Sequence, residues 1–400
     1  MRNNKKGGIT YADGFLSSGI HSGIKKEGKD LSLIYSKLPC VAVGTFTTNK
    51  FKSYSLILTM KNIKNPIHSI IVNSGNANAC NGKENYIKTK EVVGKLAEKL
   101  KVKGENILFG STGIIGAPLP YQKIISSLDE LINSLSCSGH TAAAEGIITT
   151  DTFIKESQIN TSIKGRKKEI FIGGMAKGAG MINPDMATML SFITTDAVIE
   201  RDALEIALKQ AVDKSFNMLV VDNDTSTNDM VICLANGAAR NKRIHYNTDE
   251  YFKFYQSLEN VCINLAKMIA KDGEGATKFI EVKVKGGWCE KDVKRVAKKV
   301  CGSNLVKTAI YGSQPNWGRI IASVGSCKVK FNPEKLELKI CGINIFQNGN
   351  VINFDNNLLR QKLQEKEILI EIDLKQGKYQ TSSFGCDMTE KYIKINKEYE

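Results

Sequence analysis

The sequence has no long uninterrupted apolar run. No window approaches the roughly 18 apolar residues that a membrane-spanning helix needs. The first residues, Met1 to Lys6, are polar and basic, and they lead into Gly7–Ile9 without the apolar stretch of a secretory signal. Hydrophobic residues make up 42% and charged residues 24% of the chain, as in ordinary globular proteins. We therefore expect a soluble protein that is not exported and does not bind membranes.

Paired cysteines and clustered histidines are also missing. Ten cysteines are scattered between Cys40 and Cys386 without a C-x-x-C pair, and several, such as Cys233 and Cys262, lie in apolar stretches. This distribution is typical of reduced thiols, which favours a cytoplasmic location. The four histidines lie far apart and show no ligand spacing, so no metal site is expected.

Positive charge is abundant, but no basic cluster interleaved with aromatic residues is present. The net charge is +15, carried mostly by lysines spread along the whole chain. Solvated helix faces explain this pattern better than a phosphate-binding surface does. No nucleic-acid partner is therefore expected. A basic RNA or DNA binder is kept as an alternative, which a steep salt dependence of binding would favour.

Two common catalytic or phosphate-binding motifs are absent as well. The glycine-rich segments GGMAKGAG at 173–180 and DGEGATK at 272–278 lack the spacing and the G-K-[ST] ending of a P-loop. The chain also lacks the G-x-S-x-G elbow of the α/β-hydrolases. Chemistry must therefore be sought in less common patterns.

The chain is too long for one hydrophobic core. Its 400 residues exceed the usual limit of about 250 to 300, so two lobes are expected, although no repeat or linker marks their border. Apolar periodicity predicts helices and strands in alternation, and hence a mixed α and β class. The predicted helices run through Ile87–Leu100, Ile124–Leu135, Leu204–Ala211 and, from an N-cap at Thr248, to about Ile269, and the predicted strands cover Ile67–Asn73, Ile280–Val284, Leu336–Ile340 and Ile368–Ile372.

The most informative stretch is Gly173–Ala197, which reads GGMAKGAGMINPDMATMLSFITTDA. Four glycines flank Lys177, and glycine permits positive φ and a close approach of the backbone. The Asn-Pro pair at 183–184 predicts a turn. Met189–Ile193 has apolar residues on both of its alternating faces, as expected of a strand buried between two layers. We expect an irregular glycine-rich loop that enters a buried strand.

Thr188 lies where that strand is expected to begin. Threonine favours strands and its hydroxyl can bond a nearby carbonyl, so an ordinary structural role is one interpretation. The other is chemical: the hydroxyl could attack the strained bond between Ala187 and Thr188 in an N-to-O acyl shift, and hydrolysis would free the α-amine. Such an amine, with a reference pKa of about 7.7 to 8.0, can act as general base for its own Oγ.

Chemistry of this kind needs donors for an oxyanion. Gly110–Gly116 reads GSTGIIG, in which backbone N–H groups could point at one position beside the hydroxyls of Ser111 and Thr112. A plain tight turn is the alternative for this segment. By itself it does not decide between them.

The motifs quoted above, taken together with others in the same order, resemble the ArgJ family, the glutamate N-acetyltransferases or ornithine acetyltransferases of arginine biosynthesis. The resemblance covers nearly the whole chain. It is carried by GIKK at 23–26, GTFTTNKFK at 44–52, IVNSGNANAC at 71–80, GSTGIIG at 110–116, TTDTF at 149–153, KGAGMINPDMATML at 177–190, SFNMLVVDNDTSTND at 215–229, DGEGATK at 272–278, QPNWGRI at 314–320 and FGCDMTEKYIKIN at 384–396.

The resemblance implies a precursor that cuts itself between Ala187 and Thr188. Its products would be an α chain, residues 1–187, and a β chain, residues 188–400, which stay together, commonly as α2β2. The implied fold is α/β (α+β), of the self-cleaving N-terminal-nucleophile-like ArgJ and DmpA type, with sheets layered by helices and a smaller C-terminal α/β lobe from about residue 280. No cofactor is implied, and use of acetyl-CoA as a co-substrate is left open.

The resemblance also implies site residues. Thr188 would be the nucleophile, and Thr112 and Gly113 would form the oxyanion hole. Lys177 would hold a substrate carboxylate or keep the amine of Thr188 deprotonated, and Glu274 would pair with the ammonium group of ornithine. The complete substrate-contacting set implied is Thr152, Lys177, Thr188, Glu274 and Asn396, the last through its amide N–H on an α-carboxylate.

The implied reaction moves the acetyl group of N2-acetylornithine to glutamate through an acetyl-threonine ester. A related self-cleaving amidase or aminopeptidase, in which water replaces glutamate, is the alternative. The chain departs from the family in three places: it lacks the usual threonine after the KIN motif, Asn223 replaces a glycine, and Gln314 replaces an acidic residue. The first departure puts one substrate contact in doubt.

Overall fold

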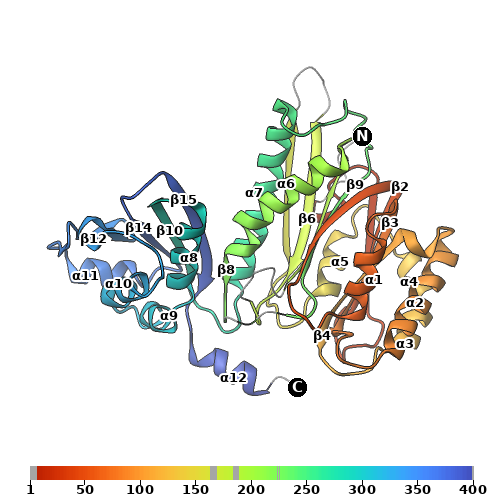
Figure 1. The fold of residues 1–400 in the computed structure, drawn as a ribbon. Helices are drawn as coiled ribbons and strands as arrows, with labels where there is room; N and C mark the ends of the chain where they lie inside the picture. The colour runs from red at the N-terminus through yellow and green to blue at the C-terminus, as the bar shows by residue number, and fades with distance from the viewer. Residues whose placement is uncertain (1–6, 163–168, 183–188, 223, 225, 399–400) are drawn as a thin grey trace. The chain divides into compact units, whose positions relative to one another are not determined.

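The protein folds into two compact units, each built on a sheet with helices (Figure 1). The computed structural model describes residues 7–162, 169–182, 189–222, 224 and 226–398. The first unit comprises the described parts of residues 1–178, 185–213 and 225–265, and the second those of residues 179–184, 214–224 and 266–400. The predicted mixed α/β class is confirmed.

The first unit contains an eight-stranded sheet that folds over on itself at its longest strand, β2. The strand order is β4-β3-β2-β9-β7-β6-β5, with β1 paired to β2. Residues Leu31–Tyr35 of β2 pair with β3, and Val41–Phe46 pair with β9, with a break in register between Tyr35 and Cys40. The bounds are β1 Phe15–Ile20, β2 Leu31–Phe46, β3 Ile67–Asn76, β4 Ile107–Ile114, β5 Lys155–Ser162, β6 Glu169–Lys177, β7 Leu190–Thr195 and β9 Met230–Ala235.

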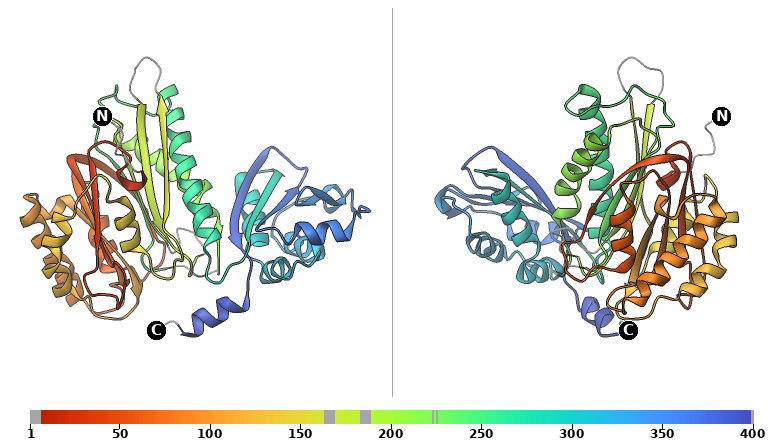
Figure 2. Two further views of the ribbon diagram at one scale, coloured as in Figure 1. Left: turned by 180° about the vertical axis from the view of Figure 1, so that it is seen from behind. Right: turned by 45° about the vertical axis from the view of Figure 1, so that its right-hand side comes forward.

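Both halves of the folded sheet contribute to one hydrophobic core. Buried side chains from the β3 and β4 half meet those from the β6, β7 and β9 half, including Val72, Leu108, Met175, Phe192 and Ile232. A second cluster joins the other face of β3 and β4 to α2, α3 and α4. Figure 2 shows α6 and α7 beside the half of the sheet that contains β6, β7 and β9. The helices are α1 Tyr54–Asn62, α2 Glu84–Leu100, α3 Tyr121–Ser126, α4 Leu128–Asn133, α5 His140–Ile147, α6 Arg201–Lys214 and α7 Asp249–Lys271.

Two helix predictions can be compared with these bounds in detail. The hydroxyl of Thr248 accepts the N–H of Tyr251 at 3.2 Å, so the predicted N-cap of α7 is confirmed. The single helix predicted through Ile124–Leu135 is wrong, because the helix is interrupted at Ser127. The Ser127 hydroxyl donates to the carbonyl of Lys123 at 2.8 Å, a contact of the kind that bends helices.

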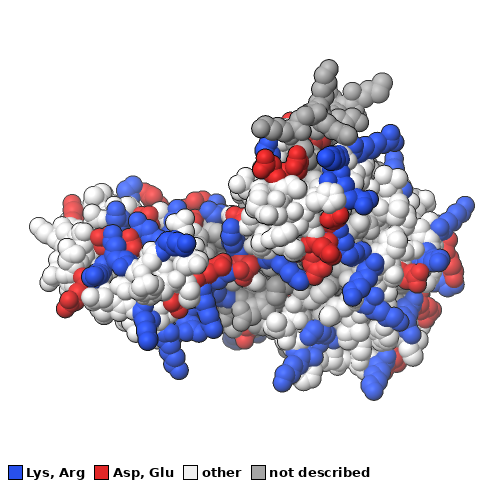
Figure 3. Space-filling model, turned by 45° about the horizontal axis from the view of Figure 1, so that its top comes forward, with Lys and Arg blue, Asp and Glu red and all other residues white. Residues whose placement is uncertain are grey.

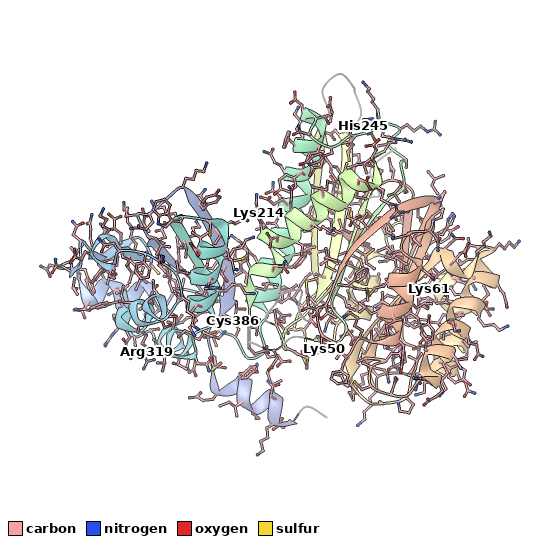
Figure 4. The ribbon with its side chains drawn as sticks, in the orientation of Figure 1. Lys50, Lys61, Lys214, His245, Arg319 and Cys386 are labelled. Carbon is pink, nitrogen blue, oxygen red and sulfur yellow. The ribbon has the colours of Figure 1, made fainter. Side chains whose placement is uncertain are left out.

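The second unit contains a seven-stranded sheet in the order β13-β12-β11-β14-β10-β15-β8. The predicted alternation at Ile280, Val282 and Val284 is confirmed, because all three are buried on β10. Figure 4 marks Cys386 at the end of β15 and Arg319 on α10. The bounds are β8 Leu219–Val220, β10 Phe279–Gly287, β11 Glu337–Ile340, β12 Ile343–Gln347, β13 Asn350–Val351, β14 Glu367–Asp373, β15 Tyr379–Cys386, α8 Glu290–Cys301, α9 Asn304–Tyr311, α10 Trp317–Gly325, α11 Asn356–Lys362 and α12 Glu390–Glu398.

The glycine-rich stretch corrects one expectation. Gly173 and Gly174 belong to the buried strand β6 and not to a loop. A Cβ atom at Gly173 would lie 2.1 Å from the carbonyl oxygen of Gly8, so this glycine permits close packing of two backbones. Lys177 is the last residue of β6. The strand predicted at Met189–Ile193 is confirmed as β7, and all its residues are buried.

On the face drawn in Figure 3, the charged side chains do not gather in one patch of a single sign. Lysine and arginine residues are interspersed with carboxylates. Within the described residues, no helix has both the length and the apolar character needed to cross a membrane.

Candidate active site

Thr112 and Lys177 meet inside the first unit, although they come from different halves of the folded sheet. Thr112 is near the end of β4, and Lys177 ends β6. The Lys177 ammonium donates to Thr112 Oγ1 at 3.2 Å and to Thr149 Oγ1 at 2.8 Å. Thr112 is 8% and Lys177 5% exposed. The structure therefore brings two of the predicted site residues into direct contact in a buried position.

This contact sets the direction in which the Thr112 hydroxyl can donate. A hydroxyl has one hydrogen and two acceptor lone pairs. Because its oxygen accepts from Lys177, the hydrogen of Thr112 is left to point toward another acceptor. A donor polarised by an adjacent cation in a water-poor site is well suited to a developing oxyanion.

Gly113 follows in a conformation that only glycine adopts without strain. Its φ is +130°, and a Cβ atom there would lie 2.4 Å from the carbonyl carbon of Gly75 on β3. The ladder between β3 and β4 is irregular at the same point, between Gly75 and Asn76. The backbone after Thr112 therefore departs from regular strand geometry at Gly113, the residue predicted to supply a backbone donor.

Asn228 holds this irregular strand end in place. Its amide nitrogen donates to the carbonyl of Ala77 at 2.6 Å and to the carbonyl of Ser111 at 2.7 Å. The Ser111 hydroxyl in turn donates to Asn73 Oδ1 at 2.7 Å. The residue before Thr112 is thus fixed from both sides, which limits the movement of the Thr112 hydroxyl.

Asp151 is the carboxylate that supports Lys177. Its side chain is completely buried and lies 2.6 Å from the ammonium of Lys155, which is also completely buried. It also accepts the N–H of Gly178 at 2.7 Å and that of Thr149 at 3.1 Å. Burial acts to raise the pKa of Asp151, but the Lys177 and Lys155 charges and the Gly178 N–H lower it to about 2. Asp151 thereby holds in place both Gly178, which follows Lys177, and Thr149, whose hydroxyl accepts from Lys177.

Replacing Asp151 with Asn should strongly destabilise the protein. Removal of one partner of a buried ion pair leaves the other charge uncompensated and typically costs about 3 to 5 kcal/mol. Because the pKa of Asp151 lies below its unfolded value, its contribution is complete above about pH 4 and is lost as the pH falls toward 2. Urea unfolding followed by circular dichroism at neutral pH measures the loss.

Asp129→Asn is the matched control, since Asp129 also lies 2.6 Å from a lysine, Lys99, but is 74% exposed. Its expected cost is at most about 1 kcal/mol. Equal unfolding midpoints for the two variants would contradict the assignment of Asp151 as a buried structural charge.

Glu274 and Asn396 form a separate group in the second unit. Glu274 lies between α7 and β10, and its N–H donates to the carbonyl of Ala179 at 2.9 Å. Its carboxylate rests on Gly180, where a Cβ atom would come within 2.4 Å of it. Asp222 accepts the N–H groups of Met181 and Ile182, both at 2.6 Å.

The electrostatic potential around this group is negative. Burial raises the pKa of Tyr392 strongly, and the nearby charges of Asp222, Glu274 and Asp224 raise it further. Burial also raises the pKa of Asp222, and the charge of Glu274 raises it further, while three backbone N–H donors act to lower it. A cluster of carboxylates with this field favours a cationic ligand group over an anionic one.

Asn396 lies on α12 with both amide hydrogens in use. Its nitrogen donates to Glu274 Oε2 at 2.9 Å and to the carbonyl of Tyr392 at 3.0 Å. The amide therefore orients the Glu274 carboxylate. The sequence analysis expects this amide to bind an α-carboxylate of the substrate through its N–H. To do so, Asn396 would have to give up one of its two present hydrogen bonds.

The remaining predicted residues are placed as follows. Thr152 is exposed in the segment between α5 and β5. Ala187 and Thr188 lie outside the described residues. In the described part of the chain, no group of three or more His, Cys, Asp or Glu side chains is arranged to hold a metal ion.

Several residues of this site were not predicted. Thr149 and Asp151 belong to the TTDTF motif and Asn228 to the SFNMLVVDNDTSTND motif, and none of these three residues was assigned a role from the sequence. The sequence alone does not show that these short polar side chains are buried, and without that information no role could be assigned to them. The signal that could have identified them is the concentration of polar residues in two short segments.

Comparison with known proteins agrees with these motifs. A sequence model of the ArgJ family matches residues 16–400. The arginine biosynthesis bifunctional protein ArgJ of Caldanaerobacter subterraneus subsp. tengcongensis is 44% identical over 98% of this chain and 98% of that protein. Its counterpart in Thermotoga neapolitana is 46% identical over 96% and 98%. The crystal structure of the Bacillus halodurans protein of the same name aligns with a TM-score of 0.52 at 41% identity, covering 53% of this chain and 100% of that chain.

Proposed function

Because the chain belongs to the ArgJ family, we propose that it is a glutamate N-acetyltransferase that takes the acetyl group from N2-acetylornithine. The family match and two relatives above 40% identity over nearly the whole chain support this activity. The geometric observation that carries it is the buried contact between Lys177 and Thr112, which supplies an oxyanion donor.

The mechanism proceeds in two acyl transfers. The Oγ of Thr188 attacks the acetyl carbonyl of N2-acetylornithine, the α-amine of Thr188 takes the Oγ proton, and ornithine leaves with that proton. Thr112 Oγ and the N–H of Gly113 hold the oxyanion in each tetrahedral intermediate. The amine of glutamate then attacks the acetyl-threonine ester, giving N-acetylglutamate and the free hydroxyl.

Self-cleavage before Thr188 supplies the amine, and the resulting chains are residues 1–187 and 188–400. The solved Bacillus halodurans chain corresponds in full to 53% of this chain, a share close to that of residues 188–400. This supports a division into two polypeptides that stay together, which we expect to assemble as α2β2 in the cytoplasm. Thr152, Lys177, Thr188, Glu274 and Asn396 are proposed as substrate-contacting residues from the family resemblance alone.

Purified protein tests the proposal directly. With N2-acetylornithine as donor, acetyl transfer to glutamate should exceed release of acetate to water, as measured by mass spectrometry of the products. Faster release of acetate than transfer would favour the amidase alternative. Acetyl-CoA in place of N2-acetylornithine tests whether the enzyme has a second acetyl donor, as the word "bifunctional" in its relatives' name suggests.

Glu274→Gln should weaken use of N2-acetylornithine by about ten- to a hundredfold. The change removes a charge-assisted hydrogen bond to the ornithine ammonium, worth about 1.5 to 3 kcal/mol. The amide keeps the size of the side chain but cannot pair with the cation. The measurement is kcat/KM for N2-acetylornithine, with the cleaved fraction read from a denaturing gel.

Glu334→Gln is a control, because Glu334 is an exposed carboxylate of the same unit that lies in a short 3-10 turn. It should leave both cleavage and kcat/KM unchanged. Undiminished kcat/KM in Glu274→Gln would remove Glu274 from the ammonium site, whatever the state of cleavage.

A further inference from the structure

The loop that carries Glu274, residues 272–278, is tied to the segment that leads from β15 into α12. Asp387, in that segment, is 3% exposed. Its Oδ1 accepts the N–H of Thr277 at 2.8 Å and that of Lys278 at 3.0 Å, and its Oδ2 accepts the Thr277 hydroxyl. The N–H of Asp387 in turn donates to the carbonyl of Lys278 at 3.1 Å. A single buried carboxylate therefore joins the two segments.

A second connection lies directly beside Glu274. The Thr389 hydroxyl donates to the carbonyl of Gly275, the next residue in the loop, at 2.7 Å. Gly275 has a φ of +72°, and a Cβ atom there would lie 2.6 Å from the backbone nitrogen of Tyr392. Glycine therefore allows the loop to lie against the first turn of α12.

The position of α12 depends on such polar contacts. None of its residues is buried, so apolar packing contributes little to holding this helix in place. The Tyr311 hydroxyl of α9 donates to Glu390 at the start of α12, at 2.9 Å. Further along the helix, the Asn396 amide donates to Glu274 Oε2 at 2.9 Å. The anchoring of the first turn of α12 therefore determines where Asn396 meets Glu274.

Lys278 fixes the other end of the loop to the body of the second unit. Its ammonium donates to the carbonyls of Ile310 and Leu363, both at 2.7 Å, at the ends of α9 and α11. It also donates to Ser313 Oγ at 2.7 Å. Because Asp387 accepts the backbone N–H of this same lysine, it ties α12 to a point that two helices hold.

We propose that Asp387 is a positioning residue for substrate recognition, which holds the Glu274 carboxylate and the Asn396 amide in the arrangement that binds the ammonium group of the acetyl donor. The inference rests on the proposed function, in which Glu274 pairs with the ammonium of N2-acetylornithine. Asp387 acts through the hydrogen bonds that it accepts from the loop. Its charge is not required, because an amide oxygen in the same place accepts the same N–H groups.

Asp387→Ala should raise KM for N2-acetylornithine by about tenfold and leave kcat within about twofold of the wild-type value, with rates referred to the cleaved fraction. A contact made equally in the bound substrate and in the transition state affects KM and not kcat, and a small misplacement of a binding group is enough to weaken it. Acetyl exchange between N-acetylglutamate and isotopically labelled glutamate involves no ornithine ammonium, so it should keep the wild-type rate. Equal losses in both reactions would assign Asp387 to the fold alone and overturn the proposal.

Asp387→Asn separates position from charge. Its amide oxygen can accept the N–H groups of Thr277 and Lys278, and its amide nitrogen can donate to the Thr277 hydroxyl. KM for N2-acetylornithine should therefore stay within about threefold of the wild-type value. A KM as high as that of Asp387→Ala would show that the charge itself is needed, which contradicts a positioning role.

A double-mutant cycle tests whether Asp387 acts through Glu274. In a Glu274→Gln background, Asp387→Ala should raise KM much less than it does in the wild-type background, because both changes weaken one and the same contact. If the full increase of about tenfold appears in both backgrounds, the two residues act independently and the proposal fails.

Asp355→Ala is the matched control. Asp355 is another carboxylate of the second unit that accepts two backbone N–H groups, those of Asn357 at 2.8 Å and Leu358 at 3.1 Å, at the start of α11. Its substitution should leave both KM for N2-acetylornithine and the glutamate exchange unchanged.

Thr389→Val provides the test if Asp387→Ala does not fold. It removes the hydrogen bond to the Gly275 carbonyl at nearly constant size, and it should raise KM for N2-acetylornithine without slowing the exchange. A folded and cleaved Thr389→Val enzyme with the wild-type KM would then overturn the proposal. A failure of the proposed function gives a different result, namely a wild-type protein that transfers no acetyl group from N2-acetylornithine to glutamate.

Discussion

Thr188→Ala should remain a single polypeptide and lose acetyl transfer to the background of the assay. The substitution removes the hydroxyl that starts the N-to-O acyl shift, so the bond between Ala187 and Thr188 stays intact. It also removes the nucleophile that would carry the acetyl group. The wild-type protein, in contrast, should run as two fragments of roughly half length on a denaturing gel.

N-terminal sequencing of the larger wild-type fragment, residues 188–400, should begin at Thr188. Thr188→Ser is the conservative variant, since it retains a hydroxyl, and it should retain both cleavage and measurable transfer. Circular dichroism separates a folded but uncut Thr188→Ala protein from a misfolded one. An uncut Thr188→Ala protein with wild-type activity would exclude Thr188 as the nucleophile, and cleavage at another bond would exclude the site.

Strand and helix positions were predictable where one face alone is buried. The alternation at Ile280, Val282 and Val284 predicted β10, and the N-cap at Thr248 predicted the start of α7. Both patterns depend on neighbours in sequence. Ser127 shows the opposite case, since the apolar spacing continues across it while the helix is interrupted there and its hydroxyl donates to the carbonyl of Lys123.

The glycines near Lys177 show why local rules fail for close-packed strands. Glycine is ordinarily a sign of a loop, but Gly173 is in β6 because the backbone of Gly8 occupies the place of a side chain. Gly8 is more than a hundred residues away in the sequence. A contact that distant leaves no trace in the spacing of neighbouring residues.

The candidate site was only partly predictable for the same reason. Thr112 and Lys177 were assigned by resemblance, and their contact depends on a sheet that folds over at β2. Asp151 was not assigned, although it is the buried counter-charge near Lys177. Supporting residues of this kind act through tertiary contacts, and those contacts become visible only when the strand ends are placed side by side.

Thr112→Ala should reduce turnover by on the order of a hundredfold or more with only a modest change in KM. The hydroxyl is buried, it accepts from the Lys177 ammonium at 3.2 Å, and its hydrogen is therefore free for an oxyanion. Loss of one preorganised oxyanion donor typically has an effect of this size on kcat. Because the oxyanion forms in the transition state and not in the bound substrate, the loss should appear in kcat.

Thr112→Ser and Thr149→Ala separate the donor from the lysine contact. The serine variant keeps the hydroxyl and should recover most of the turnover. Thr149→Ala removes the other hydroxyl bound to Lys177, at 2.8 Å, but leaves the Thr112 donor in place, so its effect on kcat should be much smaller. Comparable losses in Thr112→Ala and Thr149→Ala would assign both threonines to the positioning of Lys177. Unchanged turnover in Thr112→Ala would remove Thr112 from the oxyanion hole, leaving Gly113 as the remaining predicted donor.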